Sequence, residues 1–166
     1  METLWSPWRL QYIQSNAEKT AGCVFCDLAK PSNEETDESN FLIYRGKENF
    51  VVLNIFPYTT GHLLIMPYAH FSNLYDATRE TTEEMMELAK RAQKAILDVY
   101  RPQGFNMGMN LGRAAGAGIP EHFHMHLMPR WFGDVNFVTT IAETRVIPED
   151  LPTTFRKLKP FFEDVI

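Results

Sequence analysis

Three histidines alternate with apolar residues over residues 122–128, in the run His-Phe-His-Met-His-Leu-Met. Side chains of a β-strand point to opposite faces with a period of two, so this run predicts a strand with one apolar face and one imidazole face. We expect the apolar face to enter the core and His122, His124 and His126 to line a surface or cleft. The chain has five histidines, and a purely structural role for three in alternation is the less favoured interpretation.

The rest of the pattern predicts an α+β fold. Four further strands are expected over residues 41–45, 49–54, 62–66 and 105–111. Apolar residues at helical spacing predict one long helix, which a capping box at Thr81-x-x-Glu84 begins and Pro102 ends. A short C-terminal helix is expected over residues 151–162, and the polar residues 31–40 are expected to be an exposed loop. Strands around one long helix favour an antiparallel sheet over a βαβ series.

Composition excludes several classes of protein. The 166 residues, 45% of them hydrophobic, suffice for one domain with a core, and a net charge of −5 excludes a globally basic nucleic-acid binder. No apolar run approaches the roughly 20 residues of a membrane helix. The N-terminus lacks the basic start and apolar stretch of a secretion signal, so a cytoplasmic location is expected.

The two cysteines form a Cys23-x-x-Cys26 knuckle that can place two thiolates on one metal. Tetrahedral zinc needs two more ligands, and His70 and His122 are the natural candidates. We do not expect all three alternating histidines to share one metal, because His122 and His126 would lie about 13 Å apart along the strand, although adjacent members of the set could converge. A redox pair would need a βαβ setting that does not follow here, and two inert thiols remain an alternative.

A glycine-rich loop precedes the histidine run. Gly112, Gly116 and Gly118 let backbone N–H groups approach an anion closely, and Arg130 supplies a positive charge after the strand. A histidine nucleophile beside such a loop suggests phosphoryl chemistry. Neutral imidazole attacks phosphorus, and its second nitrogen must then donate to a carbonyl group, which fixes the tautomer.

Several motifs together resemble the histidine triad (HIT) family. They are His122-Phe-His-Met-His-Leu-Met128 followed by Pro-Arg, Cys23-x-x-Cys26, Asn54-x-x-Pro57, Gly61-His62-Leu-Leu-Ile-Met-Pro67 and His70. The segments 4–9, 110–118 and 129–137 further resemble the diadenosine tetraphosphate phosphorylase branch. The resemblance implies a single HIT domain with an N-terminal arm (1–22), a family core (23–131) and a C-terminal extension (132–166).

The resemblance also implies a mechanism for cleaving dinucleoside polyphosphates. His124 attacks the α-phosphate and forms a nucleotidyl-histidine, and His126 contacts phosphate and helps to protonate the leaving group. The resemblance implies a structural zinc held by Cys23, Cys26, His70 and His122. This agrees with the strand geometry, which assigns different roles to the three alternating histidines. No organic cofactor is expected, and family members are typically homodimers with a joined sheet. Trp5, Trp8 and Trp131 are candidates for interface or substrate-entrance contacts.

Nucleotide contacts are carried over to two groups of residues. Asn54 takes the place of an acidic residue that binds ribose in many relatives, with Ile55 and Phe56 beside the base, whereas Asn110, Gly116 and Gly118 hold phosphate. Many hydrolase-type relatives have a glutamine in this loop, but here it reads Ala-Gly-Ala-Gly-Ile-Pro, which favours phosphorolysis. A nucleoside phosphoramidate hydrolase, a nucleotide-binding sensor and a metal-dependent hydrolase are the alternatives.

Overall fold

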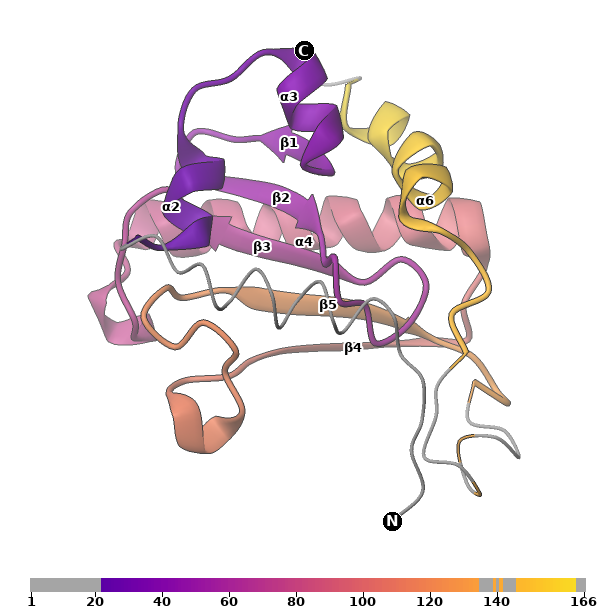
Figure 1. Ribbon diagram of the computed structural model, residues 1–166. Helices are drawn as coiled ribbons and strands as arrows, with labels where there is room; N and C mark the ends of the chain where they lie inside the picture. The colour runs from indigo at the N-terminus through magenta and orange to yellow at the C-terminus, as the bar shows by residue number, and fades with distance from the viewer. Residues whose placement is uncertain (1–21, 135–138, 140, 142–145, 164–166) are drawn as a thin grey trace.

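The sheet of this protein has five antiparallel strands in the order β1-β2-β3-β5-β4 (Figure 1). The computed structural model describes residues 22–134, 139, 141 and 146–163. The strands are β1 (Leu42–Arg45), β2 (Asn49–Leu53), β3 (Leu63–Pro67), β4 (Gly104–Met109) and β5 (Met125–Arg130). The helices are α2 (Val24–Ala29), α3 (Glu34–Ser39), α4 (Arg79–Tyr100) and α6 (Leu151–Leu158), with 3-10 turns η1 (Leu74–Asp76), η2 (Arg113–Ala115) and η3 (Lys159–Phe162). The α+β prediction is confirmed.

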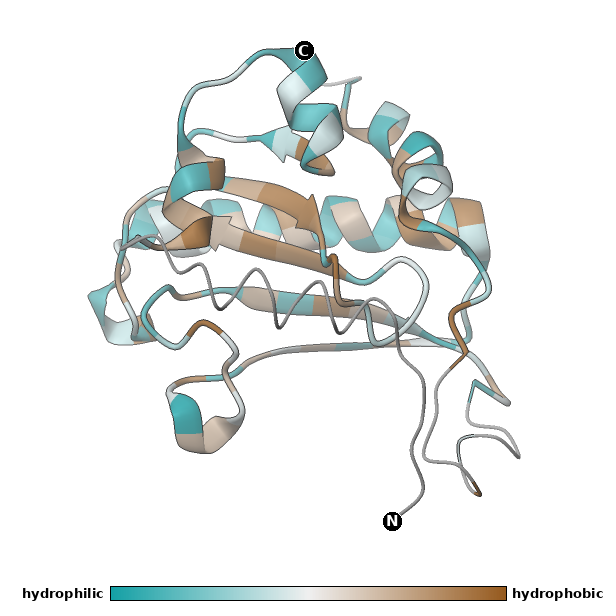
Figure 2. Cartoon of the chain, in the orientation of Figure 1, coloured by the Kyte–Doolittle hydropathy of each residue, from teal (hydrophilic) through white to brown (hydrophobic). Residues whose placement is uncertain are grey.

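One face of the sheet packs against α4, whose buried stripe includes Met85, Ala92 and Ile96. Figure 2 shows that β2 and β3 are the most continuously hydrophobic strands, as expected for the middle of a sheet covered on both sides. Phe155 of α6 and Phe162 of η3 complete this core. It also takes in the apolar members of the histidine run, so the predicted assignment of strand faces is confirmed.

The opposite face carries a smaller apolar cluster under α2, in which Phe25 packs with residues of β1, β2 and β3. The three histidines lie on this side, because Phe25 makes edge contacts with the rings of His122 and His124. The predicted strand at 122–128 is shifted in the structure, since β5 begins at Met125. His122 and His124 precede it because the N–H of Phe123 donates to the carbonyl oxygen of Phe71, outside the strand ladder.

Two local predictions are wrong. The N-cap of α4 is Thr78, whose side chain accepts from the N–H of Thr81, and Glu84 takes no part in a capping box. Its carboxylate accepts instead from the N–H groups of the β1–β2 turn, at Lys47, Glu48 and Asn49. The expected loop at 31–40 contains the short, exposed helix α3, because the Asn33 side chain caps its first turn by accepting from the N–H of Thr36.

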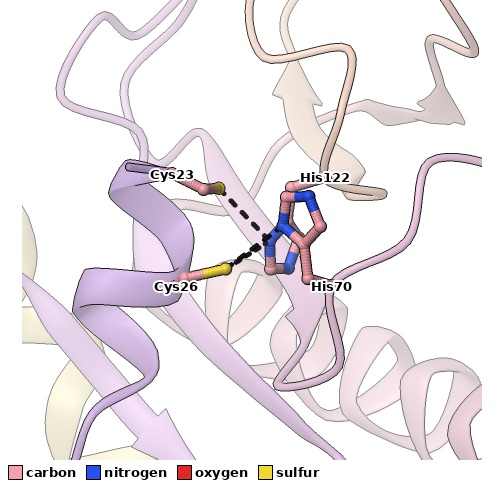
Figure 3. Close-up of side chains that lie close together, drawn as sticks. All are labelled: Cys23, Cys26, His70 and His122. Atoms are coloured by element: carbon pink, nitrogen blue, oxygen red, sulfur yellow. Dashed lines mark hydrogen bonds between the residues drawn. The ribbon is translucent and has the colours of Figure 1, made fainter. Parts of the chain in front are cut away.

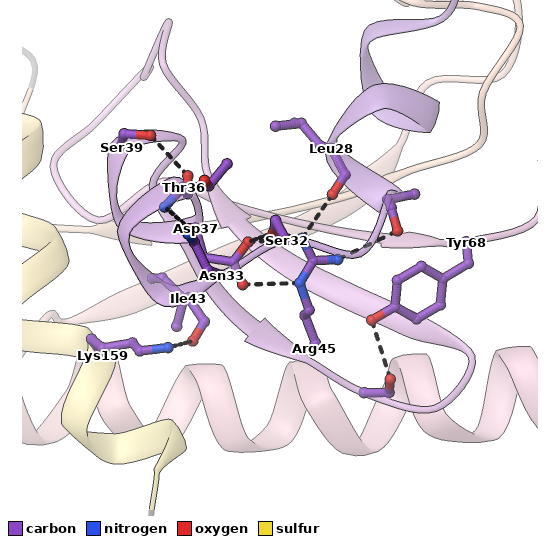
Figure 4. A network of polar contacts seen from close by, with 12 residues as sticks. Leu28, Ser32, Asn33, Thr36, Asp37, Ser39, Ile43, Arg45, Tyr68 and Lys159 are labelled. Atoms are coloured by element: carbon purple, nitrogen blue, oxygen red, sulfur yellow. Dashed lines mark hydrogen bonds and ion pairs between the residues drawn. The ribbon is translucent and has the colours of Figure 1, made fainter.

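Arg45 ties α2 and α3 to the edge of the sheet (Figure 4). Its guanidinium donates to both carboxylate oxygens of Asp37 at 2.8 and 2.9 Å, and to the carbonyl oxygens of Leu28 and Ala29 at the end of α2. Ser32 adds hydrogen bonds to both Arg45 and Asp37. This fork fixes the position of a helix too short to hold its place by backbone hydrogen bonds alone.

Some sequence expectations concern residues outside the described ranges. Trp5 and Trp8 lie there, as does almost all of the expected N-terminal arm 1–22. Within the described ranges, every helix is too short or too polar to span a bilayer. Among the described strands, β4 pairs only with β5 and is an edge of the sheet. Of its residues, Met107 is half exposed.

Candidate functional site

Four side chains from three separate parts of the sequence form one cluster beside α2 (Figure 3). The ligand atoms of Cys23, Cys26, His70 and His122 all lie within 4.8 Å of one another. The sulfur of Cys26 is 3.2 Å from Nδ1 of His70 and 3.5 Å from Nδ1 of His122, and the sulfur of Cys23 is 3.4 Å from Nδ1 of His122. Tetrahedral zinc, with bonds of about 2.3 Å to sulfur and 2.0–2.1 Å to nitrogen, separates these ligand atoms by about 3.5 Å.

The surrounding structure orients the donor atoms of this cluster toward one another. Cys23 is the N-cap of α2 and Cys26 follows one turn later, so the two sulfurs face the same side. Nε2 of His122 donates to the carbonyl oxygen of Pro67 at 2.9 Å, which leaves the lone pair of Nδ1 directed at the sulfurs. Loss of hydration and the neighbouring Cys23 raise the pKa of the Cys26 thiol, and a bound cation would offset this cost. The donor set therefore fits zinc, as predicted.

His124 is held in one tautomer. Its Nδ1 lies 2.8 Å from the carbonyl oxygen of His122, and a carbonyl oxygen only accepts, so Nδ1 carries the hydrogen. Nε2 then has a free lone pair. This is the arrangement that the sequence analysis required of a histidine nucleophile. The same residue, His122, provides the carbonyl group that orients His124 and a ring that belongs to the cluster of cysteines and histidines.

His126 is oriented by His62, to which the sequence motifs assigned no chemical role. Nε2 of His62 lies 2.9 Å from Nδ1 of His126. Nδ1 of His62 accepts from the N–H of Tyr58 at 3.1 Å and faces the amide nitrogen of Asn54 at 3.3 Å. Nδ1 of His62 is therefore unprotonated, its Nε2–H donates to His126, and the hydrogen of His126 is on Nε2. His126 is thus a donor, whereas His124 presents a lone pair.

Burial keeps these imidazoles neutral. Loss of hydration, with repulsion from the other histidines, lowers the pKa of His62 to about 3 and that of His126 to about 4. Burial also lowers the pKa of His124, despite its hydrogen bond to the His122 carbonyl. At neutral pH the site therefore contains the unprotonated Nε2 of His124 beside the neutral N–H donor of His126.

The glycine-rich loop differs in part from the expectation. Gly112 and Gly116 have positive φ angles of 81° and 88°, whereas Gly118 does not. The N–H of Gly116 donates to Arg113 and that of Ala117 to Gly112, so these groups are used inside the loop. Gly116 therefore provides the positive φ angle of the loop, and its N–H group is already hydrogen-bonded within the loop.

The positive charge expected after the strand is balanced locally. Arg130 is the last residue of β5 and pairs with the carboxylate of Asp134. Its guanidinium also donates to the side chain of Asn106 at 2.7 Å. The positive charge of Arg130 is therefore neutralised by Asp134 at the end of β5.

The residues expected to bind the nucleotide have distinct positions. Asn54 uses its side chain within the protein, because Oδ1 accepts from the N–H of Phe56 and Nδ2 faces His62. Ile55 and Phe56 follow in the β2–β3 connection and are partly exposed, at 53% and 37%. Asn110 follows β4, where Gly108 is paired with His126, so alternation places Asn110 on the histidine face.

Comparison with known proteins decides the family. The HIT domain family matches residues 35–133, about three fifths of the chain. The chain belongs to the HIT family. It is 40% identical to a Mycobacterium tuberculosis protein named AP-4-A phosphorylase, over 95% of this chain and 83% of that protein. It is 33% identical to adenosine 5'-monophosphoramidase of Saccharomyces cerevisiae, over 78% of this chain and 77% of that enzyme.

A solved HIT structure extends the likeness to the fold. The zinc-bound histidine triad family protein from Mycobacterium smegmatis superposes with a TM-score of 0.67 at 29% identity, covering 86% of this chain and 94% of that one. The resemblance drawn from the motifs is thereby confirmed, as is the HIT-like fold. The zinc in that neighbour and the cluster of two cysteines and two histidines here are mutually consistent.

Proposed function

We propose that this HIT protein is a nucleotidyltransferase that cleaves dinucleoside polyphosphates of the diadenosine tetraphosphate type through a nucleotidyl-histidine on His124. The observation that carries the proposal is the 2.8 Å contact between Nδ1 of His124 and the His122 carbonyl, because it leaves Nε2 as a nucleophile. The likeness to proteins named for reactions of adenine nucleotides supports this substrate class.

In the first step, Nε2 of His124 attacks the α-phosphorus and the bond from that phosphorus to the bridging oxygen breaks. The bridging oxygen leaves with the remaining phosphates and nucleoside, and the Nε2–H of His126 stabilises its negative charge by a hydrogen bond. For diadenosine tetraphosphate the products are adenylyl-His124 and ATP. Neutral His126 acts here as a hydrogen-bond donor that stabilises the developing negative charge, and the leaving polyphosphate departs as an anion without taking the proton of His126.

In the second step, an oxygen nucleophile attacks the same phosphorus and releases His124. Inorganic phosphate gives ADP, whereas water gives AMP. The loop sequence Ala-Gly-Ala-Gly-Ile-Pro places no side-chain amide beside the phosphates, which leaves room for a second phosphate and favours phosphorolysis. The 40% identical relative named a phosphorylase supports the same choice.

Zinc has a structural role in this proposal. When bound, it supplies no chemistry at phosphorus but links α2 to the segment that carries His122. We further propose that the chain forms a homodimer, as the family resemblance implies. The 33% identical phosphoramidase supports a second candidate function, the hydrolysis of nucleoside phosphoramidates.

The test is a substrate panel of dinucleoside polyphosphates and nucleoside phosphoramidates, each with and without inorganic phosphate. In parallel, the protein is isolated without acid after reaction with a substrate that carries a labelled adenylyl group, so that a labelled intermediate is retained. We expect adenylyl-His124 to accumulate, ADP to form only with phosphate, and His124→Ala to lose turnover while nucleotide affinity changes less than about tenfold. Turnover that is indifferent to phosphate contradicts phosphorolysis. Full activity of His124→Ala contradicts the mechanism, and binding without any turnover favours a sensor.

A further inference from the structure

A cavity of about 580 Å³ opens at the end of the sheet where β5 leaves it. Its walls come from the β2–β3 connection, the end of α4, the segment after β5 and the segment that leads into α6. The lining residues with aromatic rings are Tyr58, Tyr100, Trp131 and Phe132. The motifs that identify the family assign no role to this cavity.

Tyr58 connects the cavity to the histidines. Its ring lies 4.8 Å from the ring of His62 and 6.1 Å from that of His126, in a nearly parallel stack with the latter. The same ring lines the cavity. Tyr58 therefore contacts both His126 and the cavity, and neither His126 nor His62 is among the lining residues.

The spacing of these rings suits the length of a dinucleoside polyphosphate. The ring centroids of His124 and His126 are 5.0 Å apart, and those of His126 and Tyr58 are 6.1 Å apart. In the proposed reaction the α-phosphate is at His124 and the leaving oxygen is at His126, so the leaving group continues toward Tyr58. Neighbouring phosphorus atoms share one bridging oxygen, so a path of this length spans several phosphates before it reaches the cavity.

The chemistry of the walls favours a planar, uncharged group over a phosphate. Among the described residues of the lining, Lys157 is the only one with a cationic side chain, and its ammonium pairs with the Glu149 carboxylate. Glu149 also accepts from the hydroxyls of Tyr100 and Thr154. A polyphosphate would find little unbalanced positive charge here, whereas a base would find aromatic surfaces.

The aromatic surface is already held in place. Phe132 is 93% exposed, yet its backbone N–H donates to the side chain of Gln103 at 3.0 Å. The neighbouring Trp131 donates its indole N–H to the carbonyl oxygen of Tyr100. An exposed ring on an anchored backbone loses little conformational freedom when a ligand stacks on it.

We infer that this cavity binds the second nucleoside of the substrate, the one that leaves with the outer phosphates, and that Phe132 stacks on its base. The inference rests on the proposed function, since it assumes attack at His124 and departure past His126. It explains how one chain selects a dinucleoside polyphosphate over a nucleoside polyphosphate that ends in phosphate. Stacking on an aromatic side chain contributes about five- to hundredfold in affinity for a base.

The test compares two ligands that differ only in the second nucleoside. They are diadenosine tetraphosphate and adenosine tetraphosphate, both with methylene groups in place of the oxygens that bridge the α- and β-phosphates, so that neither is cleaved. Calorimetric titration of the full chain gives the dissociation constant of each. We expect the dinucleotide to bind at least fivefold more tightly. Phe132→Ala should remove this difference without changing the affinity for adenosine tetraphosphate, and Phe132→Tyr should keep it.

Tyr75→Ala is the matched control, because Tyr75 is also a strongly exposed aromatic residue but lies in η1, outside the cavity. It should leave both affinities unchanged. Equal affinity of the wild-type protein for the two ligands, or an equal loss for both in Phe132→Ala, overturns the inference. If adenylyl-His124 still forms from cleavable diadenosine tetraphosphate in that case, the proposed function holds and only this inference is wrong. If neither ligand binds and no adenylyl-His124 forms, both proposals are wrong.

Discussion

Nε2 of His62 and Nδ1 of His126 lie 2.9 Å apart, and this contact gives His126 its hydrogen on Nε2. The N–H of Tyr58 donates to the other nitrogen of His62. Only one assignment of hydrogens to the ring nitrogens of His62 and His126 therefore satisfies these contacts. In the proposed mechanism, His62 therefore acts on the reaction through His126. It is a positioning residue in the proposed mechanism.

Replacement of His62 by Phe should lower turnover about 10- to 100-fold, because the variant keeps an aromatic ring but loses the hydrogen bond that orients His126. The affinity for uncleaved nucleotide analogues should change little. Turnover numbers are measured with diadenosine tetraphosphate and with adenosine 5'-phosphorofluoridate, whose fluoride leaving group is a much weaker base and depends less on a hydrogen-bond donor. An equal loss with both substrates would show that His62 only supports packing.

Asn54→Asp provides a separate test of the same chain of contacts. Aspartate keeps the oxygen that accepts from the N–H of Phe56 but replaces the amide donor that faces His62 with an acceptor. We expect turnover to fall about tenfold and the imidazole nitrogen shifts of His62 and His126 in NMR spectra to report a changed tautomer. If Asn54 only binds ribose, the variant should change the Michaelis constant and leave these shifts unaltered.

Stability should fall as the pH is lowered below about 6.5. A histidine in the unfolded chain has a pKa near 6.5, whereas in the folded protein burial holds the pKa of His62 at about 3 and that of His126 at about 4. Between these values the unfolded chain binds more protons, so the free energy of unfolding decreases with decreasing pH. Urea unfolding at several pH values checks this slope, and His62→Phe should reduce it. An unchanged slope in that variant would contradict the assignment.

Zinc removal should loosen both the fold and the active site. We expect one zinc per chain by elemental analysis and little or none in Cys26→Ser. A stability loss of about 2 kcal/mol would lower the melting temperature by about 4–8 °C in a chain of this size. Turnover should also fall, because the His122 carbonyl orients His124. A zinc-free protein with the melting temperature and turnover of the wild type would contradict a structural zinc.

Arg45→Lys should weaken zinc retention although Arg45 does not touch the cluster. The guanidinium fork bonds Asp37 and the carbonyl oxygens at the end of α2, and an ammonium group cannot reproduce this geometry. The side chains of Arg45 and Asp37 are 24% and 15% exposed, so the pair is only partly screened by solvent. We expect faster zinc loss to a chelator than in the wild type. Arg79→Lys, in an exposed pair on α4, is the matched control and should have no effect.

Local sequence patterns determined the main chemistry of the site. A period of two assigned the histidines and the apolar residues to opposite strand faces, because side-chain direction in a strand depends only on position along the chain. The short reach of metal–ligand bonds separated His122 from His124 and His126 and paired it with the cysteines. The structure brings Cys23, Cys26, His70 and His122 together as that argument required.

The tertiary structure decided what depends on neighbours distant in sequence. His62 and His126 are 64 positions apart and meet because β3 and β5 are adjacent, with Leu64 in register with His126. Two other contacts also join residues that are distant in the sequence. Glu84 of α4 accepts hydrogen bonds from the β1–β2 turn, and the N–H of Phe123 donates to the carbonyl oxygen of Phe71. Periodicity specifies which way a side chain points, whereas its partner is set by strand order and register, which arise only when the whole sheet and its core assemble.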